Sequence, residues 1–94
     1  MQKLGTSINM NIPTPIIEID CHGLNVEQAI KKVSEAVSKA SDTTYRVRVI
    51  HGFNSGTRIK SAIKEEFSFG REPKVLRVQP GDNLGITDLI LREY

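Results

Sequence analysis

The sequence predicts an α/β fold, a two-layer α/β sandwich in which a mixed four-stranded sheet and two helices follow one another in the order βαβαββ. Two observations lead to this fold class. Segments whose apolar residues recur at every second position alternate along the chain with two segments whose apolar residues recur at every third or fourth position. In addition, a chain of 94 residues, 38% of them hydrophobic, has room for one core only. Both helices must therefore cover the apolar face of the same sheet.

The first half of the domain predicts a strand, a helix and a second strand. Apolar and polar side chains alternate over residues 16–22 and again over residues 45–51. The helix between them begins after Asn25, a favourable N-cap, and Gln28 completes the spacing of a capping box. The core-facing stripe of this helix consists of Val26, Ala29, Ile30, Val33, Val37 and Ala40.

The second half predicts a helix followed by a hairpin of two strands. Gly70 and Pro73 are stop signals for the helix, and the strands cover residues 75–79 and 86–92. Each β–α–β step is expected to leave successive strands parallel, whereas the final hairpin adds an antiparallel strand. The stripe of the second helix consists of Ile59, Ala62, Ile63 and Phe67.

Residues 1–15 lack helical periodicity and are expected to form a flexible arm, with an added edge strand as the alternative. Residues 16–94 then form the single domain. No apolar run approaches the roughly 18–20 residues of a membrane helix, and the start lacks the apolar core of a secretion signal. A single cysteine excludes a disulfide framework and a cysteine-rich zinc site. We expect a cytoplasmic protein that does not bind membranes; the sequence leaves its oligomeric state open.

Positive charge is concentrated in one part of the chain. Residues 46–77 contain eight basic and three acidic residues, a balance of +5, whereas the whole chain carries +2. This asymmetry is compatible with an anionic partner such as a nucleic acid, although ordinary solvated helix faces explain it equally well.

Three loops are expected to meet at one edge of the sheet. They cover residues 20–23, 51–56 and 80–85, and they contain both histidines of the chain. The carboxyl ends of parallel strands point to the same edge, where α/β proteins commonly bind their ligands. The functional site is therefore expected at this edge.

Asp20 and His22 lie two positions apart on a strand and so face the same side. The carboxylate can hold a metal ion or orient the imidazole, and the imidazole can transfer protons near neutral pH. The alternative is structural: Asp20 caps backbone amides of the following turn, and His22 fills space beneath the start of the helix.

A glycine-bracketed loop leads from the second strand into the second helix. The glycines permit positive φ and close backbone approach, and the amides at a helix start attract anions. Arg58 and Lys60 add positive charge there, and Phe53 is placed to contact a base. A plain strand–helix turn, with Phe53 as a packing lid, is the alternative. The loop consists of His51, Gly52, Phe53, Asn54, Ser55 and Gly56.

These segments resemble the motifs of the Smr (small MutS-related) domain family. The L-D-x-H-G signature of that family resembles Ile19-Asp20-Cys21-His22-Gly23. Its H-G-x-G-x-G loop is similar to residues 51–56, and its closing G-x-T-x-V-x-L strand is similar to residues 85–91. Order and spacing agree from residue 16 to residue 94. The chain departs from the family pattern at Asn54, where the loop often has its middle glycine, and at Cys21, where an aliphatic residue is usual.

The resemblance implies a fold similar to the C-terminal domain of bacterial translation initiation factor three, and nucleic acid as the ligand. Some members of the family nick DNA or cleave RNA. Others are modules of mismatch-repair-like ATPases or repeat proteins, some of which act on ribosomes. Transferred by position, the resemblance implies roles for Asp20, His22, His51, Gly52 and Gly56.

Our leading hypothesis is a nucleic-acid-binding Smr-like domain for branched or structured DNA or RNA, and metal-assisted endonuclease activity is the reaction that we consider for it. The glycine loop, Arg58 and Lys60 hold the phosphate; Asp20 holds Mg²⁺ or Mn²⁺ or acts as a base; His22 or His51 transfers protons. Two alternatives remain: a non-catalytic module that binds RNA or ribosomes, and a protein-interaction module in which the N-terminal arm pairs with a partner strand. The sequence does not distinguish DNA from RNA.

Overall fold

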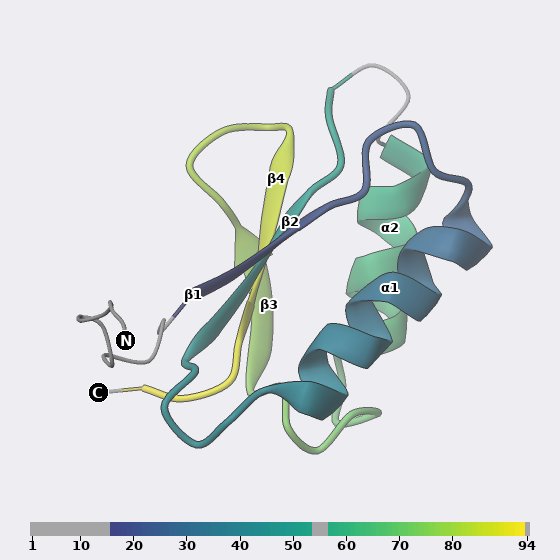
Figure 1. Cartoon of the computed structure of the whole chain (residues 1–94). Coiled ribbons are helices and arrows are strands. Elements are labelled where there is room, and N and C mark those ends of the chain that lie inside the picture. The colour runs from purple at the N-terminus through teal and green to yellow at the C-terminus, as the bar shows by residue number, and fades with distance from the viewer. Residues whose placement is uncertain (1–15, 54–56, 94) are drawn as a thin grey trace, which may run out of the picture.

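The computed structural model describes residues 16–53 and 57–93 and confirms the two-layer sandwich (Figure 1). Both helices lie on one face of a four-stranded sheet. The predictions made for residues 1–15 and for Asn54, Ser55 and Gly56 lie outside the described residues. The elements are β1 (Ile16–Asp20), α1 (Val26–Lys39), β2 (Arg46–Ile50), α2 (Thr57–Phe67), β3 (Arg77–Pro80) and β4 (Ile86–Ile90).

The sheet has the strand order β1-β2-β4-β3. β1 pairs with β2 in parallel, from Ile16 opposite Arg46 to Asp20 opposite Ile50. β4 is antiparallel to both of its neighbours, β2 and β3. As a result β1, β2 and β3 all run in one direction, and the loops that follow them leave the sheet at the same edge, as the topology predicted.

Each strand is shorter than the alternation of the sequence suggested, and turns follow β1 and precede β3. The Asp20 carboxylate accepts the backbone N–H of His22 at 3.1 Å, and Gly23 turns the chain with a φ of 80°. At the start of β3, the N–H of Val75 donates to the carbonyl of Glu72 within a turn. The adjacent amides of Cys21 and Leu76 still donate to Ile50 of β2 and Ile90 of β4, at 2.8 and 2.7 Å, so pairing continues for one residue beyond these strand ends.

The N-terminus of α1 has the predicted capping box. The Asn25 side chain accepts the N–H of Gln28 at 2.8 Å, and the Gln28 side chain accepts the N–H of Asn25 at 3.1 Å. The pair thereby satisfies two amides that the helix leaves without acceptors. Within residues 16–53 and 57–93, neither helix has the length and apolar character needed to span a membrane.

The core lies between the helices and one face of the sheet. α1 contributes Ala29, Val33 and Val37, whereas Val26 at its start is exposed. The thiol of Cys21 is fully buried, and this burial raises its pKa, so the cysteine is a core residue. The other core residues are Val47, Val49, Ile59, Ile63, Phe67, Val75 and Leu89.

The opposite face of the sheet has a buried carboxylate between two arginines. Asp88 of β4 accepts from the guanidinium of Arg46 at 3.1 Å, and its other oxygen lies 3.5 Å from Nε of Arg48. Arg48 also reaches the exposed Glu18 of β1 at 3.4 Å. This ion-pair network links three neighbouring strands through their side chains.

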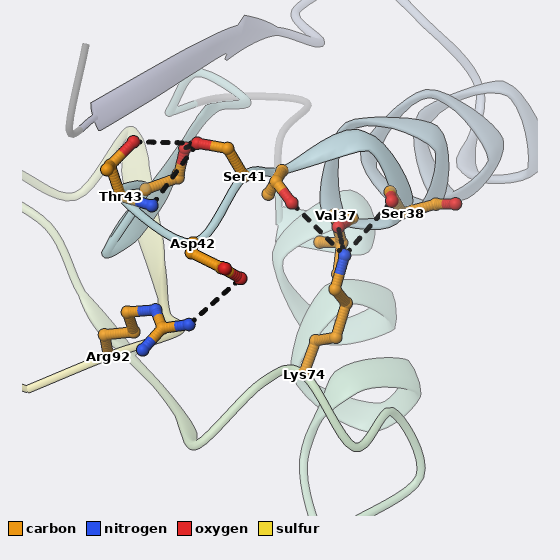
Figure 2. Close-up of polar contacts among 9 residues, drawn as sticks. Val37, Ser38, Ser41, Asp42, Thr43, Lys74 and Arg92 are labelled. Carbon is orange, nitrogen blue, oxygen red and sulfur yellow. Dashed lines mark hydrogen bonds and ion pairs between the residues drawn. The ribbon is translucent and has the colours of Figure 1, made fainter. Parts of the chain in front are cut away.

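The C-terminus of α1 is held by a lysine from a distant part of the sequence (Figure 2). Lys74 lies between α2 and β3, and its Nζ donates to the carbonyls of Val37 and Ser38 at 3.1 Å and of Ala40 at 3.3 Å. The last carbonyls of a helix lack intrahelical donors and carry partial negative charge. The ammonium group of Lys74 therefore donates to three carbonyl oxygens and links the end of α1 to the loop before β3.

We expect Lys74→Met to lower the free energy of unfolding by about 1–2 kcal/mol, because methionine keeps the aliphatic stem and removes the three hydrogen bonds. Urea unfolding followed by circular dichroism measures the change. Lys31→Met is the matched control, since Lys31 is exposed on α1 and forms no ion pair among the described residues. Equal losses in the two variants would show that the contacts of Lys74 contribute nothing specific.

Candidate functional site

The loops that follow β1, β2 and β3 leave the sheet at one edge (Figure 1), and the loop after β2 contacts the other two. The backbone N–H groups of His51 and Gly52 both donate to the carbonyl of Gly85, at 2.9 and 3.0 Å. A Cβ placed on Gly52 would lie 3.9 Å from the Cβ of His22. The structure thus confirms that these three segments converge.

Asp20 and His22 form an exposed pair at this edge. Nδ1 of His22 lies 2.9 Å from Oδ1 of Asp20, and the two side chains are 74% and 59% exposed. Since an ionised carboxylate only accepts hydrogen bonds, Nδ1 carries the proton and donates it. In the neutral ring, Nε2 is then the basic nitrogen, and it forms no hydrogen bond within the described residues. The pair is therefore an imidazole oriented by a carboxylate and open to a ligand.

Of the two structural alternatives for this pair, the geometry supports the one for Asp20 and excludes the one for His22. Asp20 does cap the turn, since it accepts the backbone N–H of His22 at 3.1 Å. His22 does not fill space beneath the helix, because most of its side chain is exposed. Asp20 thus has two functions at once: it fixes the turn and it orients the ring.

Hydrogen bonds from the side chain and then the backbone of His22 hold the pKa of Asp20 below its ordinary value of 3.8, with a smaller contribution from the charge of Lys32. The unfolded chain therefore takes up a proton at Asp20 at a higher pH than the folded protein does. The stabilisation by this pair is complete above pH 3.8 and is lost as the pH falls through the lower pKa of the folded state.

From this shift we expect Asp20 to stay ionised throughout the range above about pH 5. Any loss of activity on acidification in that range must then come from another group. A titration of the side-chain carboxyl carbon of Asp20, followed by NMR between pH 2 and pH 7, measures this. A midpoint for Asp20 above its ordinary pKa of 3.8 would contradict the prediction.

His51 is buried beneath the glycine loop. Its Nδ1 lies 2.9 Å from the carbonyl oxygen of Gly52 and so must donate to it. In the neutral ring Nε2, 2.8 Å from Oγ1 of Thr87, then accepts from the hydroxyl. Both ring nitrogens are occupied. A proton could pass through His51 only after one of these bonds breaks, whereas the intact ring ties the glycine loop to β4.

We expect Thr87→Val to lower the free energy of unfolding by about 1–3 kcal/mol, because it leaves the buried Nε2 of His51 without a partner. Thermal or urea unfolding checks this. Thr44→Val is the matched control: Thr44 is equally buried, but its hydroxyl lies 3.5 Å from Oγ of the exposed Ser41, where water can replace it. If both variants lost the same free energy of unfolding, the hydrogen bond between Thr87 and His51 would stabilise the fold no more than the contact of Thr44 does.

The start of α2 has the features of an anion site. Gly52 has a φ of 85°, and the first N–H groups of the helix, from Thr57 onward, point toward the loop edge. Arg58 is exposed and Lys60 half-buried on the first turn, and neither forms an ion pair in the part of the chain that the structure describes. Beside them lies a cavity of about 180 Å³, lined by His51, Gly52, Phe53, Thr57, Lys60 and Leu84.

With this geometry in place, the chain was compared with known proteins. Residues 19–83 match the Smr domain family, a span of more than half the chain. The chain belongs to the Smr domain family. The crystal structure of the Smr domain of Thermus thermophilus MutS2 superposes on this Smr domain with a TM-score of 0.71 and 27% identity, covering 82% of this chain and 99% of the other.

A second relative is a longer protein. Endonuclease MutS2 of Aquifex aeolicus (strain VF5) is 30% identical, and the match covers 82% of this chain. The chain spans only 11% of the length of that relative. The fold and the family of this Smr domain are therefore established, and the family is linked to an endonuclease.

The described residues of this Smr domain do not by themselves supply a complete set of protein ligands for a metal ion. No group of three or more histidine, cysteine, aspartate or glutamate side chains that could hold a metal occurs within residues 16–53 and 57–93. Oδ1 of Asp20 already accepts two hydrogen bonds, which leaves Oδ2 as its free oxygen. Magnesium sites in nucleic-acid enzymes use one or two carboxylates together with water and phosphate oxygens. A requirement for Mg²⁺ or Mn²⁺ stays a prediction.

Sequence reasoning missed two residues of the cavity in this Smr domain, Thr57 and Leu84. Thr57 begins α2, and Leu84 is the one large apolar residue in a loop of proline, glycine, aspartate and asparagine. An isolated apolar side chain in a polar loop next to a predicted site is a signal that could have identified Leu84.

Proposed function

We propose that this Smr domain binds nucleic acid at the loop edge and cleaves a phosphodiester there, with His22 as the residue that transfers protons. The observation that carries the proposal is the exposed pair of Asp20 and His22, 2.9 Å apart, beside the glycine loop. The likeness to an endonuclease MutS2 supports cleavage as the reaction.

The phosphate is bound at the start of α2 in this proposal. The first N–H groups of the helix lack intrahelical acceptors and carry partial positive charge, which favours a phosphate oxygen. Arg58 and Lys60 add two cations with no ion pair among the described residues. Not all of the positive charge in residues 46–77 can attract a phosphate, because Arg46 and Arg48 are paired with the buried Asp88.

In the reaction, Nε2 of His22 accepts the proton of the attacking oxygen, which is the 2′-hydroxyl in RNA or a water molecule in DNA. A new bond forms between that oxygen and phosphorus, the bond from phosphorus to the leaving sugar oxygen on the opposite side breaks, and the leaving oxygen takes a proton from water. The imidazolium of His22 afterwards returns its proton to the solvent. The Asp20 carboxylate stabilises the imidazolium. His51 acts as a positioning residue that holds the glycine loop against β4.

Incubation of the purified protein with supercoiled plasmid and with structured RNA, each with EDTA or with Mg²⁺ or Mn²⁺, tests the proposal. We expect a nicked plasmid or RNA fragments, and the comparison shows whether an ion is required. Binding without cleavage under all of these conditions would contradict the reaction and leave a non-catalytic module for RNA or ribosomes. Absence of binding would contradict both.

A further inference from the structure

Two large apolar side chains are exposed at the mouth of the cavity of about 180 Å³ next to the proposed phosphate site. Phe53 is 59% exposed and Leu84 is 70% exposed, and both line this cavity. Their relative position is fixed by the backbone, because the N–H of Gly52 donates to the carbonyl of Gly85 at 3.0 Å. Each apolar residue adjoins one partner of that bond, so the pair is held together by two different loops.

A second cavity of about 180 Å³ lies on the other side of Lys60. It is lined by Lys60, Lys64, Gln79 and Pro80, together with Val78 and Thr87. Lys60 lines both cavities, and neither Lys60 nor Lys64 forms an ion pair within the described residues. An apolar recess and an adjoining pair of free ammonium groups thus follow one another along α2.

We propose that Phe53 and Leu84 hold one unstacked nucleobase and that Lys60 and Lys64 bind the phosphate next to it. The inference rests on the proposed nucleic-acid binding and adds the kind of nucleotide that is bound. A base offers a flat apolar face for an aromatic ring, and its neighbouring phosphate offers negative charge. The apolar pair from the two loops and the two lysines of α2 lie side by side, which matches the succession of a base and its phosphate along a strand.

The size of the recess favours a single base. Cavities that enclose whole drug-sized ligands hold roughly 300–1,000 Å³, so a recess of about 180 Å³ suits one ring system, while the sugar and phosphate stay outside. A base within a duplex is stacked on both faces and cannot enter. We therefore expect this pair to select nucleic acids that have an unpaired nucleotide at the bound position.

Fluorescence anisotropy with two probes of equal phosphate count, a blunt duplex and a duplex that carries a short single-stranded overhang, tests the inference in DNA and RNA forms. Phe53→Ala and Leu84→Ala should each weaken binding of the overhang probe, Phe53→Ala by about 5- to 150-fold. Both should leave binding of the blunt probe unchanged. Lys60→Gln should weaken binding of both probes and reduce the slope of log K against log salt by about 1.

The chain offers matched controls. Phe69 is 89% exposed beyond the opposite end of α2, and Leu76 is exposed beside a cavity formed with Lys74 and Leu91. Phe69→Ala and Leu76→Ala should leave the binding of both probes unchanged. An overhang probe with abasic sites should bind the wild type and Phe53→Ala equally.

The outcomes separate the inference from the proposed function. If the wild type binds the probes but Phe53→Ala and Leu84→Ala affect neither probe, or weaken both equally, the nucleobase site is wrong and nucleic-acid binding stands. If the wild type binds neither probe, the proposed function fails and the inference fails with it. Urea unfolding of each variant confirms that the comparison is made between folded proteins.

Discussion

Replacing His22 with glutamine is expected to slow phosphodiester cleavage by about 10²–10⁴-fold, which is the usual contribution of a positioned acid or base. Glutamine keeps a side-chain N–H that can donate to Asp20, but it cannot take up or release a proton at neutral pH. Because His22 is exposed and packs on no core residue, the fold should be unaffected. Single-turnover cleavage with excess protein measures the rate, and anisotropy shows that binding persists.

Two further variants test whether the slower cleavage comes from the loss of the pair of Asp20 and His22. Asp20→Asn should also reduce the rate, by a smaller factor, because the neutral amide no longer stabilises the imidazolium. Glu27→Gln should change nothing, since Glu27 is exposed on the first turn of α1 and makes no hydrogen bond among the described residues. A His22→Gln protein that cleaves at the full rate would remove His22 from the mechanism.

Asp88→Ala is expected to lower the free energy of unfolding by about 2–4 kcal/mol, the largest stability change we predict. Asp88 is buried and neutralises two arginines whose side chains are themselves largely buried, Arg46 and Arg48. Nε of each arginine already lacks a hydrogen-bond partner among the described residues. Removing the carboxylate would leave Arg46 without an ion pair among the described residues and Arg48 with only the exposed Glu18 as its partner. Urea unfolding measures the loss.

The matched control for Asp88 is an ion pair at the surface. Asp42 is fully exposed and lies 3.2 Å from Arg92, so Asp42→Ala should change the free energy of unfolding by less than about 1 kcal/mol (Figure 2). Similar losses for Asp42→Ala and Asp88→Ala would mean that burial does not strengthen the network around Asp88.

The elements of this fold were accessible from the sequence because their signals are local. The apolar periodicity, the capping box at Asn25 and the stop signals after α2 each lie within a few residues of the structure that they predict. The order of the strands in the sheet, by contrast, does not depend on local signals. Nothing in the pattern of β4 says that it pairs with β2 as well as with β3, because strand order depends on packing between distant segments.

The two histidines show how far the candidate site could be predicted. Strand alternation places His51 on the face of Val47 and Val49, which is the core face, and places His22 on the face of Asp20, which is exposed. If the alternation of the two strands had been extended to His51 and His22, the sequence would have predicted that His51 is buried and that His22 is accessible for proton transfer. The partner of His51, Thr87, is 36 residues away, and no spacing rule predicts that bond.

The central position of β4 has a consequence for synthesis of the chain. β2 and β3 do not pair with each other, and β3 is joined to the other described strands only through β4, which follows both in the sequence. A nascent chain that has left the ribosomal exit tunnel only as far as β3 therefore has a parallel pair, β1 with β2, and an orphan third strand. Gly85 and Thr87, which fix the glycine loop, arrive with β4. The binding edge should consequently form late and in one step, so that incomplete chains stay inactive toward nucleic acid.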